Sequence, residues 1–277
     1  MPDQAHTRAI TALSALGPMR VWSLLVTVFG DLAPDCPLDG PTLSALMDGI
    51  GIKPEATRVA LHRLRADGWI TSQKKGRISE HRLTPKGRRD SEAARPRIYG
   101  RPNTKETPAK VILMREAGNA LDPAVFASIG PRLFMCGQDA VAPSDAMTLA
   151  TSDIPKWLGN QIEPTVLLRS YEALFSVLNQ IDSEVTAPSS PLEIAMLRVM
   201  IVHAWRRLVL KHPILPRTAH TPEWREHDCR ALITRLLDRF ERPALARLDA
   251  HLPRDKQAEN AASIRMRARG WCLAGRA

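Results

Sequence analysis

Hydrophobic residues recur at helical spacing in two successive stretches near the start of the chain. Each stretch spaces its apolar residues by 3, 1 and 3 positions, the pattern of a helix with a buried face. The two sets are Val21, Leu24, Leu25 and Val28, and then Leu43, Leu46, Met47 and Ile50. Gly49 and Gly51 flank the last of these, and because glycine readily adopts a positive φ they predict where the second helix ends.

A third helix is predicted from Pro54 to Ala66, with two unlike faces. The predicted packed face holds Ala56, Val59, Ala60 and Leu64, and the predicted free face holds Glu55, Arg58, His62 and Arg65. Lys53 precedes this helix, where Ser, Thr, Asp or Asn would cap it better. Because Lys53 breaks a local stability rule, we expect a phosphate or a base edge to contact the start of this helix.

Two strand-like segments joined by a glycine turn follow the third helix. Ile70 and Thr71 lead into a tip with the sequence Gln73-Lys74-Lys75-Gly76-Arg77, and Ile78 to Leu83 return. Three helices followed by a hairpin is the order of a winged helix-turn-helix. In that motif the third helix enters the major groove of DNA, and we expect the basic hairpin tip to reach the neighbouring backbone or minor groove.

Charge is concentrated in the same part of the chain. Residues 53–101 hold 14 Lys and Arg against five Asp and Glu, so they carry +9 of the formal net charge of +10. A dimerisation or scaffold module with a solvated basic face is the alternative interpretation. The strong positive field around a helix-turn-helix favours DNA as the partner.

The candidate DNA-binding residues divide by the chemistry that each can perform. Arg58 is the first candidate to contact a base, since a guanidinium can bind O6 and N7 of guanine together, and Thr57 and His62 are the second. Arg63 and Arg65 are either phosphate ligands or partners of acids in the same helix. The residues predicted to hold phosphates are Lys74, Lys75 and Arg77, while Lys53 is predicted to meet a phosphate or a base edge. Six hairpin contacts in a dimer would give a log–log salt slope of roughly −5.

Between residues 109 and 162 the patterns shorten and alternate, which favours a small α+β unit. The strand-like segments are Val111 to Met114, Arg132 to Cys136 and Met147 to Ala150, and the helical ones are Pro123 to Ile129 and Ile154 to Leu158. The stretch from Ala93 to Thr107 has no periodicity, so we place a domain boundary near residue 105.

The last third of the chain is predicted to be helical. Leu167, Tyr171, Leu174, Leu178 and Ile181 are spaced by 4 or 3 residues, and so are Leu197, Ile201, Ala204 and Leu208, which predicts bundle or dimer faces. Ser190-Pro191-Leu192-Glu193 is a capping box that starts the second of these helices, and Thr221-Pro222 predicts the start of a third. A short leading helix around Ile10, Leu13 and Leu16 is also predicted.

Composition excludes several classes of function. No apolar run approaches the roughly 18 residues that span a bilayer, and no signal peptide is visible, so we expect a cytoplasmic protein. Cys36, Cys136, Cys229 and Cys272 lie singly, which argues against a disulfide framework and a metal site. No hydrolase, metalloprotease, P-loop or dinucleotide motif is present, so we expect no enzyme and no catalytic residues.

Several segments resemble the phenylacetate-degradation repressors, the PaaX family. They are Ser23 to Asp31, Arg58 to Trp69, Arg82 to Arg88, Arg97 to Tyr99, Trp205 to Leu208 and His212 to Pro216. The resemblance implies a dimeric transcriptional repressor with an N-terminal winged helix, a small ferredoxin-like (Cas2-like) middle domain and a helical C-terminal domain. It also implies an acyl-coenzyme A effector, phenylacetyl-coenzyme A, that releases the operator.

Together these inferences predict an α+β, mostly helical chain with three domains. Residues 1–104 would form a winged helix-turn-helix, 105–163 a ferredoxin-like unit, and 164–277 a helical domain for dimerisation and effector binding. We expect a sequence-specific repressor of an aromatic-acid catabolic operon that binds double-stranded DNA as a homodimer, without a membrane. A ligand-independent nucleic-acid-binding protein is one alternative. A metal-dependent nuclease is the other, although the first strand of the middle domain ends with a single acid, Glu116.

The effector would need cations for its phosphates and an apolar slot for its acyl group. Both chemistries occur together in Trp205, Arg206, Arg207, Lys211, His212 and Trp224. The alternative is a core tryptophan beside solvated arginines.

Overall fold

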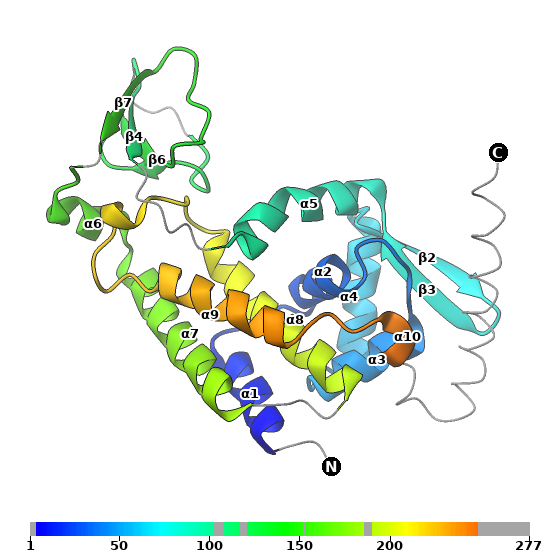
Figure 1. Ribbon diagram of the computed structural model, residues 1–277. Helices are drawn as coiled ribbons and strands as arrows, with labels where there is room; N and C mark the ends of the chain where they lie inside the picture. The colour runs from blue at the N-terminus through cyan, green and yellow to red at the C-terminus, as the bar shows by residue number, and fades with distance from the viewer. Residues whose placement is uncertain (1–3, 102–107, 117–120, 152, 186–189, 249–277) are drawn as a thin grey trace, which may run out of the picture. The chain divides into compact units, whose positions relative to one another are not determined.

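The computed structural model describes residues 4–101, 108–116, 121–151, 153–185 and 190–248, which form an α+β protein with two separate antiparallel sheets (Figure 1). The described residues divide into two compact units. Unit 1 takes its residues from 1–93, 185–203 and 237–277, and unit 2 from 94–184 and 204–236. These units differ from the three contiguous domains expected from the sequence, because several helices contribute residues to both. The predicted boundary near residue 105 lies outside the described residues.

Unit 1 contains the three predicted helices and the predicted hairpin. Its first elements are α1 (Gln4–Ala15), α2 (Val21–Leu32), β1 (Leu38–Asp39), α3 (Gly40–Gly49), α4 (Pro54–Ala66), β2 (Ile70–Lys75) and β3 (Ile78–Leu83). The three strands form an antiparallel sheet of order β1-β3-β2. The predicted helices and strands of this stretch are confirmed, and α4 begins and ends at the predicted residues. The β2–β3 hairpin extends away from α2, α3 and α4 (Figure 1).

The core of unit 1 explains why these helices form. Leu24, Leu25 and Phe29 of α2 and Leu46 of α3 are fully buried, and Leu64 of α4 is nearly so. Burial of side chains of this size stabilises the fold by about 1.5–3 kcal/mol each relative to exposure. The apolar spacing in the sequence therefore gives the packing of this unit directly.

Both α3 and α4 end in the same hydrogen-bonded motif around a glycine with positive φ. After α3, Gly51 has φ 87° and the Ile52 amide donates to the carbonyl oxygen of Met47 at 2.9 Å. After α4, Gly68 has φ 68° and the Trp69 amide donates to the carbonyl oxygen of Leu64 at 2.8 Å. These are Schellman motifs, which satisfy the last carbonyl groups of each helix and fix the direction of the chain that follows.

A helix from the last third of the sequence completes unit 1. The first residues of α8 (Pro191–Val209) lie against α2, where the Arg198 guanidinium binds the Asp31 carboxylate at 2.7 and 3.1 Å. His203 of α8 also forms a hydrogen bond with Thr27 of α2 at 3.1 Å. The Ser190 hydroxyl accepts from the Glu193 amide at 3.2 Å, which confirms the predicted cap of α8.

Unit 2 contains the second sheet, whose strands are β4 (Ala109–Leu113), β5 (Ala127–Ser128), β6 (Leu133–Cys136) and β7 (Met147–Thr151). All neighbouring strands are antiparallel, in the order β5-β6-β4-β7. The helix predicted from Pro123 to Ile129 is wrong, because Ala127 and Ser128 pair with β6 and the Asp122 side chain holds a turn before them. A ferredoxin-like unit needs helical crossovers. The described residues between β4 and β7 hold no helix, so the structure differs from that prediction.

Helices make up the rest of unit 2. They include α6 (Lys156–Ile162), α7 (Thr165–Glu184), the 3-10 turn η1 (Arg217–Ala219) and most of α9 (Glu226–Arg239), while α10 (Leu245–Leu248) falls in unit 1. The helices predicted around Tyr171 and Ile201 are confirmed. Helices α7 and α9 run side by side, joined by Arg225–Glu172 and Arg235–Asp182 ion pairs of 3.2 and 2.7 Å (Figure 1).

Two helix boundaries were wrongly predicted. Helix α5 (Pro85–Tyr99) occupies much of the stretch that lacks periodicity, and it begins where the Thr84 hydroxyl accepts from the Gly87 amide at 3.1 Å. Helix α9 begins at Glu226 and not after Thr221, because the hydroxyl and amide of Thr221 both donate to the Glu163 carboxylate. No described helix is long and apolar enough to cross a membrane.

Candidate nucleic-acid interface

One side of α4 is exposed along its whole length and carries three of the eight predicted DNA-binding residues. Arg58, His62 and Arg65 are all exposed, as predicted, and Lys53 is exposed at the start of the helix. Lys53 has extended backbone angles and its side chain makes no capping hydrogen bond. The first amides of α4 therefore remain open to a negatively charged group, which a helix N-terminus favours.

Two assignments on α4 were exchanged by the sequence prediction. Thr57 is only 6% exposed, and its hydroxyl donates to the carbonyl oxygen of Lys53 at 3.4 Å, so its prediction as a base-contacting residue is wrong. Val59 was assigned to the packed face but is 71% exposed. The exposed side of α4 includes Glu55, Arg58, Val59, His62 and Arg65, and these five residues are here called the free face.

The charged residues of α4 are held loosely enough to meet a ligand. Arg58 lies 3.7 Å from Glu55, and both side chains remain about three-quarters exposed at 76% and 74%. An exposed pair of this kind contributes about 0–1 kcal/mol, so a phosphate or base can displace it. Arg63 instead pairs with Asp67 at 3.7 Å and lies 5.0 Å over the Trp22 ring. Arg63 thus pairs with an acid at the end of α4, one of its two predicted roles, while its side chain stays 58% exposed and its other role, as a phosphate ligand, stays a prediction.

The hairpin tip presents its cations outwards. Gly76 has φ 63° while Arg77 keeps a negative φ, as a type II′ turn requires, and this turn matches the twist of the two strands. Lys74 and Arg77 are exposed, whereas Lys75 lies 3.8 Å from Glu80 and keeps 39% of its side chain exposed. Lys74 and Arg77 are thus better placed than Lys75 to bind phosphates.

A buried histidine lies between the hairpin and α4. His81 of β3 forms a 2.7 Å hydrogen bond with the Ser72 hydroxyl of β2. Burial, and then the positive charge of Arg65, lower the pKa of His81. The ring is therefore neutral at pH 7, and the positive charge that acts on it belongs to an exposed arginine of α4.

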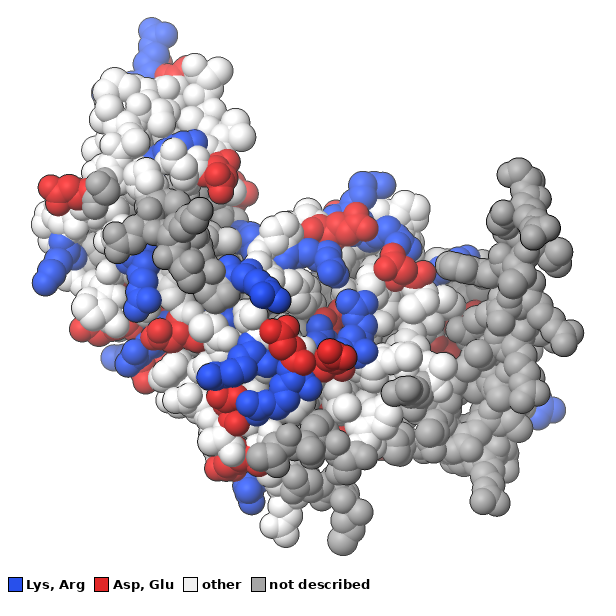
Figure 2. All heavy atoms as spheres, viewed as in Figure 1, with Lys and Arg blue, Asp and Glu red and all other residues white. Residues whose placement is uncertain are grey.

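In unit 1, basic and acidic residues are more evenly mixed after the hairpin than in residues 53–83. Residues 53–83 hold eight Lys and Arg against three acids, a net charge of +5. Over α5, the face drawn in Figure 2 shows acidic side chains among the basic ones. The excess of positive charge that DNA would meet on unit 1 therefore lies mainly on α4 and the hairpin, although Glu55 and Glu80 pair with Arg58 and Lys75 there.

The predicted effector residues lie in unit 2, where three of them surround one tyrosine. Trp205, His212 and Trp224 are at most 9% exposed, and their rings lie 6.2, 5.6 and 5.0 Å from the Tyr171 ring. These four residues are here called the aromatic cluster. The Trp205 indole donates to the carbonyl oxygen of Ile98 at 2.9 Å. This burial matches the alternative of a core tryptophan, while Arg206 and Arg207 are half-buried and Lys211 is exposed.

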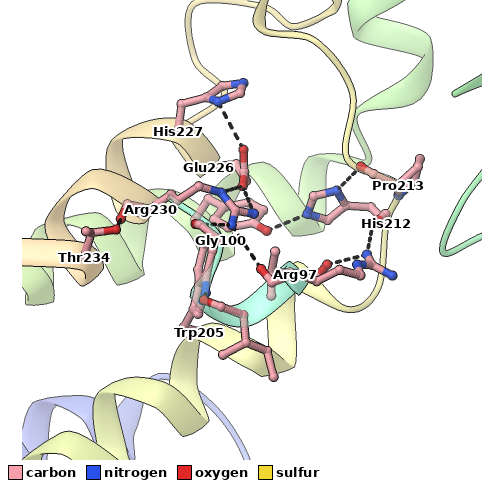
Figure 3. A network of polar contacts seen from close by, with 12 residues as sticks. Arg97, Gly100, Trp205, His212, Pro213, Glu226, His227, Arg230 and Thr234 are labelled. Atoms are coloured by element: carbon pink, nitrogen blue, oxygen red, sulfur yellow. Dashed lines mark hydrogen bonds and ion pairs between the residues drawn. The ribbon is translucent and has the colours of Figure 1, made fainter. Parts of the chain in front are cut away.

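A polar network surrounds the aromatic cluster (Figure 3). The Tyr171 hydroxyl donates to Nε2 of His212 at 2.5 Å, and Nδ1 of His212 donates to the carbonyl oxygen of Pro213 at 2.8 Å. Burial lowers the pKa of His212 to about 4, so the ring is neutral. Arg230 reaches the carbonyl oxygens of Arg97 and Gly100 at 3.0 and 3.1 Å and pairs with Glu226 at 2.7 Å.

Sequence reasoning did not find this network, because Arg97 and Gly100 lie more than a hundred residues from their partners in it. Arg97 donates to the carbonyl oxygens of Val209 and His212, which no local pattern predicts. Among the described residues, no group of three or more His, Cys, Asp and Glu side chains could hold a metal ion. Cys272 lies outside the part of the chain that the structure describes.

The chain belongs to the PaaX-like protein family. The model for "PaaX-like protein" matches residues 20–87, and the model for "PaaX-like protein C-terminal domain" matches residues 165–250. The first match covers α2 to β3 and therefore includes the free face and the hairpin tip. The family resemblance noted in the sequence is thus confirmed.

One curated relative is the Transcriptional repressor PaaX of Escherichia coli (strain K12). It is 27% identical over 246 residues, which cover 74% of this chain and 75% of the relative. A solved structure of an uncharacterized protein from Mycobacterium tuberculosis aligns with a TM-score of 0.49 and 16% identity, covering 79% of this chain and 96% of that one. The comparisons confirm the prediction of a transcriptional regulator, not an enzyme.

Proposed function

We propose that the protein is a sequence-specific DNA-binding repressor whose residues from α2 to β3 act as a winged helix-turn-helix. Helix α4 enters the major groove with its free face, and the hairpin tip contacts the neighbouring backbone. The observation that carries this proposal is the exposed, cationic free face of α4 within the segment that matches the family. The E. coli relative is named as a transcriptional repressor, which agrees with this function.

The proposal divides the work between α4 and the hairpin. Arg58 contacts a base, because its side chain is exposed and held only by a weak pair with Glu55. Lys74 and Arg77 hold phosphates, because in the described part of the chain no acid pairs with either. Base contacts carry specificity, and phosphate contacts carry affinity for any sequence.

Two further parts of the function follow from the family. The protein acts as a homodimer, whose two α4 helices meet half-sites about 34–36 Å apart on one face of the duplex. The operon that the protein represses serves aromatic-acid catabolism of the phenylacetate type. An acyl-coenzyme A such as phenylacetyl-coenzyme A releases the protein from DNA. Titration with this thioester, with tryptophan fluorescence and DNA release as the two signals, tests the effector.

The experiment that tests DNA binding compares two duplexes, one selected by the full chain from a random pool and one with the same bases scrambled. We expect Arg58→Ala to lose roughly 5- to 150-fold on the selected duplex and little on the scrambled one, since one bidentate base contact accounts for that discrimination. We expect Lys74→Ala to weaken both duplexes by the same factor and to reduce the log–log salt slope by about 1 per lost contact. Fluorescence anisotropy at several salt concentrations measures both.

A matched control is Arg169→Ala, which removes an exposed arginine from α7. It should bind both duplexes like the original chain. The proposal fails if no sequence is enriched from the pool and the chain ignores DNA at low salt. The division of roles fails if Arg58→Ala and Lys74→Ala each weaken the two duplexes equally.

A further inference from the structure

Val59 is an apolar side chain in the middle of a polar, exposed helix face. It is 71% exposed, and among the described residues of unit 1 it is the only large hydrophobic side chain that is exposed. On a helix its neighbours one turn away are Glu55 and His62, which are both exposed and polar. Val59 therefore lies at the centre of the free face.

Helix stability does not explain a valine at this position. Valine is a weaker helix former than alanine, lysine or glutamate, and at 71% exposure it gains little from burial. Its side chain is also stiff, because branching at Cβ leaves one strongly preferred rotamer in a helix. A stiff apolar group in this place suits recognition of a small apolar group on a partner.

The major groove offers one such group. Among the four bases, only thymine presents a methyl group there, while the other groups are hydrogen-bond donors and acceptors. The residue beside Val59 is Arg58, which the proposed function assigns to a base. Arg58 and Val59 are both exposed on the free face, so when Arg58 contacts a base, Val59 lies close to the neighbouring base pairs.

We infer that Val59 is a specificity-determining residue that contacts the C5-methyl group of a thymine next to the base read by Arg58. This inference rests on the proposed function, because it requires α4 to enter the major groove. It adds a base preference that the arginine alone does not supply. An operator half-site then carries a thymine whose methyl group contributes to affinity.

The test replaces each thymine of the selected duplex, one at a time, by deoxyuridine, which removes only the methyl group. For the full chain we expect about a fourfold loss of affinity at one thymine per half-site, as for one buried methyl-sized group. We expect Val59→Ala to bind the unmodified duplex correspondingly more weakly, and to lose nothing further when that thymine becomes deoxyuridine. Val166→Ala is the matched control, since Val166 is 79% exposed on α7.

Three outcomes would overturn the inference. In the first, no single deoxyuridine weakens binding by the full chain. In the second, Val59→Ala and the deoxyuridine weaken binding independently, so that their effects multiply. In the third, Val59→Ala changes the oligomeric state and leaves base preference intact, which would place Val59 in a protein contact. If the full chain enriches no duplex at all, the proposed function itself has failed, and that result is distinct from these three.

Discussion

At the scale of single residues, one buried ion pair joins α2 to α8 within unit 1. The side chains of Arg198 and Asp31 are 9% and 1% exposed, and Arg198 also donates to the carbonyl oxygens of Leu237 and Phe240 at 3.1 and 2.9 Å. All the charge of this guanidinium is therefore balanced inside the protein. Removing one partner from such a pair leaves an uncompensated buried charge, which is costly.

We expect Asp31→Ala to lower the free energy of unfolding by about 3–5 kcal/mol, because Arg198 stays buried without its counter-charge. Urea denaturation at pH 7 measures the change. The control is Asp35→Ala, since Asp35 is 77% exposed in its pair with Arg88 and exposed pairs contribute about 0–1 kcal/mol. Equal losses for the two variants would show that Asp31 does not balance Arg198 as argued.

The sequence predicted most free-face residues but placed Thr57 and Val59 on the wrong sides. Helical periodicity assigns faces by assuming that apolar residues point inwards. The assumption fails for Thr57, because its hydroxyl donates to the carbonyl oxygen of Lys53 and the polar side chain can therefore be buried. It fails for Val59, which is apolar but exposed, and for which we infer a contact with DNA. Arg198 was not predicted at all, since a buried arginine depends on an acid 167 residues away.

At the scale of elements, the start of α4 lacks a stabilising cap and carries a cation instead. Lys53 holds the capping position without a capping hydrogen bond. We expect Lys53→Ser to raise the free energy of unfolding by about 0.5–1 kcal/mol, because a serine hydroxyl would accept from the first free amides. We also expect it to weaken DNA binding, because a cation is lost where a phosphate would lie. Urea denaturation and anisotropy measure the two effects.

A second variant at Lys53 separates the two causes. Lys53→Gln removes the charge without supplying a good cap, so it should weaken DNA binding while leaving the free energy of unfolding nearly unchanged. If Lys53→Ser binds DNA as tightly as the original chain, Lys53 does not contact a phosphate.

Elements were predictable where local signals define both ends. Helix α4 begins at a proline and ends two residues before Gly68, and the hairpin turns at Gly76, so their limits follow from the sequence. Helix α5 was missed because its residues lack an apolar stripe, although Thr84 and Pro85 mark its start. The start of α9 was misplaced because Thr221 bonds to Glu163, a distant carboxylate that no local signal reveals.

At the scale of the whole molecule, the arrangement of the chain into units could not be read from the sequence. Each unit gathers stretches that lie far apart in the chain, and periodicity carries no information about which stretches meet. Composition did indicate the class of partner, because the net charge is concentrated near α4. Three strands of the sheet in unit 2 were predicted, but β5 was predicted as part of a helix and the pairing was not predicted, because both depend on contacts between short segments.

Folding of the whole chain should be sensitive to acid through His212. Its imidazole accepts from Tyr171 and donates to the Pro213 carbonyl, and burial lowers its pKa to about 4. In the unfolded chain a histidine has a pKa of about 6.5, so between these values the unfolded state binds a proton that the folded state does not. Stability is therefore fully present above pH 6.5 and falls as the pH is lowered towards 4.

From His212 alone we expect the free energy of unfolding to be about 2 kcal/mol lower at pH 5 than at pH 7. Burial lowers the pKa of His81 and of His227 as well, so both add to the loss in the same direction. Urea denaturation at the two pH values should show a smaller difference for His212→Gln, which cannot take up a proton. The exposed His62 provides the comparison, and His62→Gln should keep the original difference. An unchanged pH dependence in His212→Gln would mean that this ring is not what makes the aromatic cluster of unit 2 sensitive to acid.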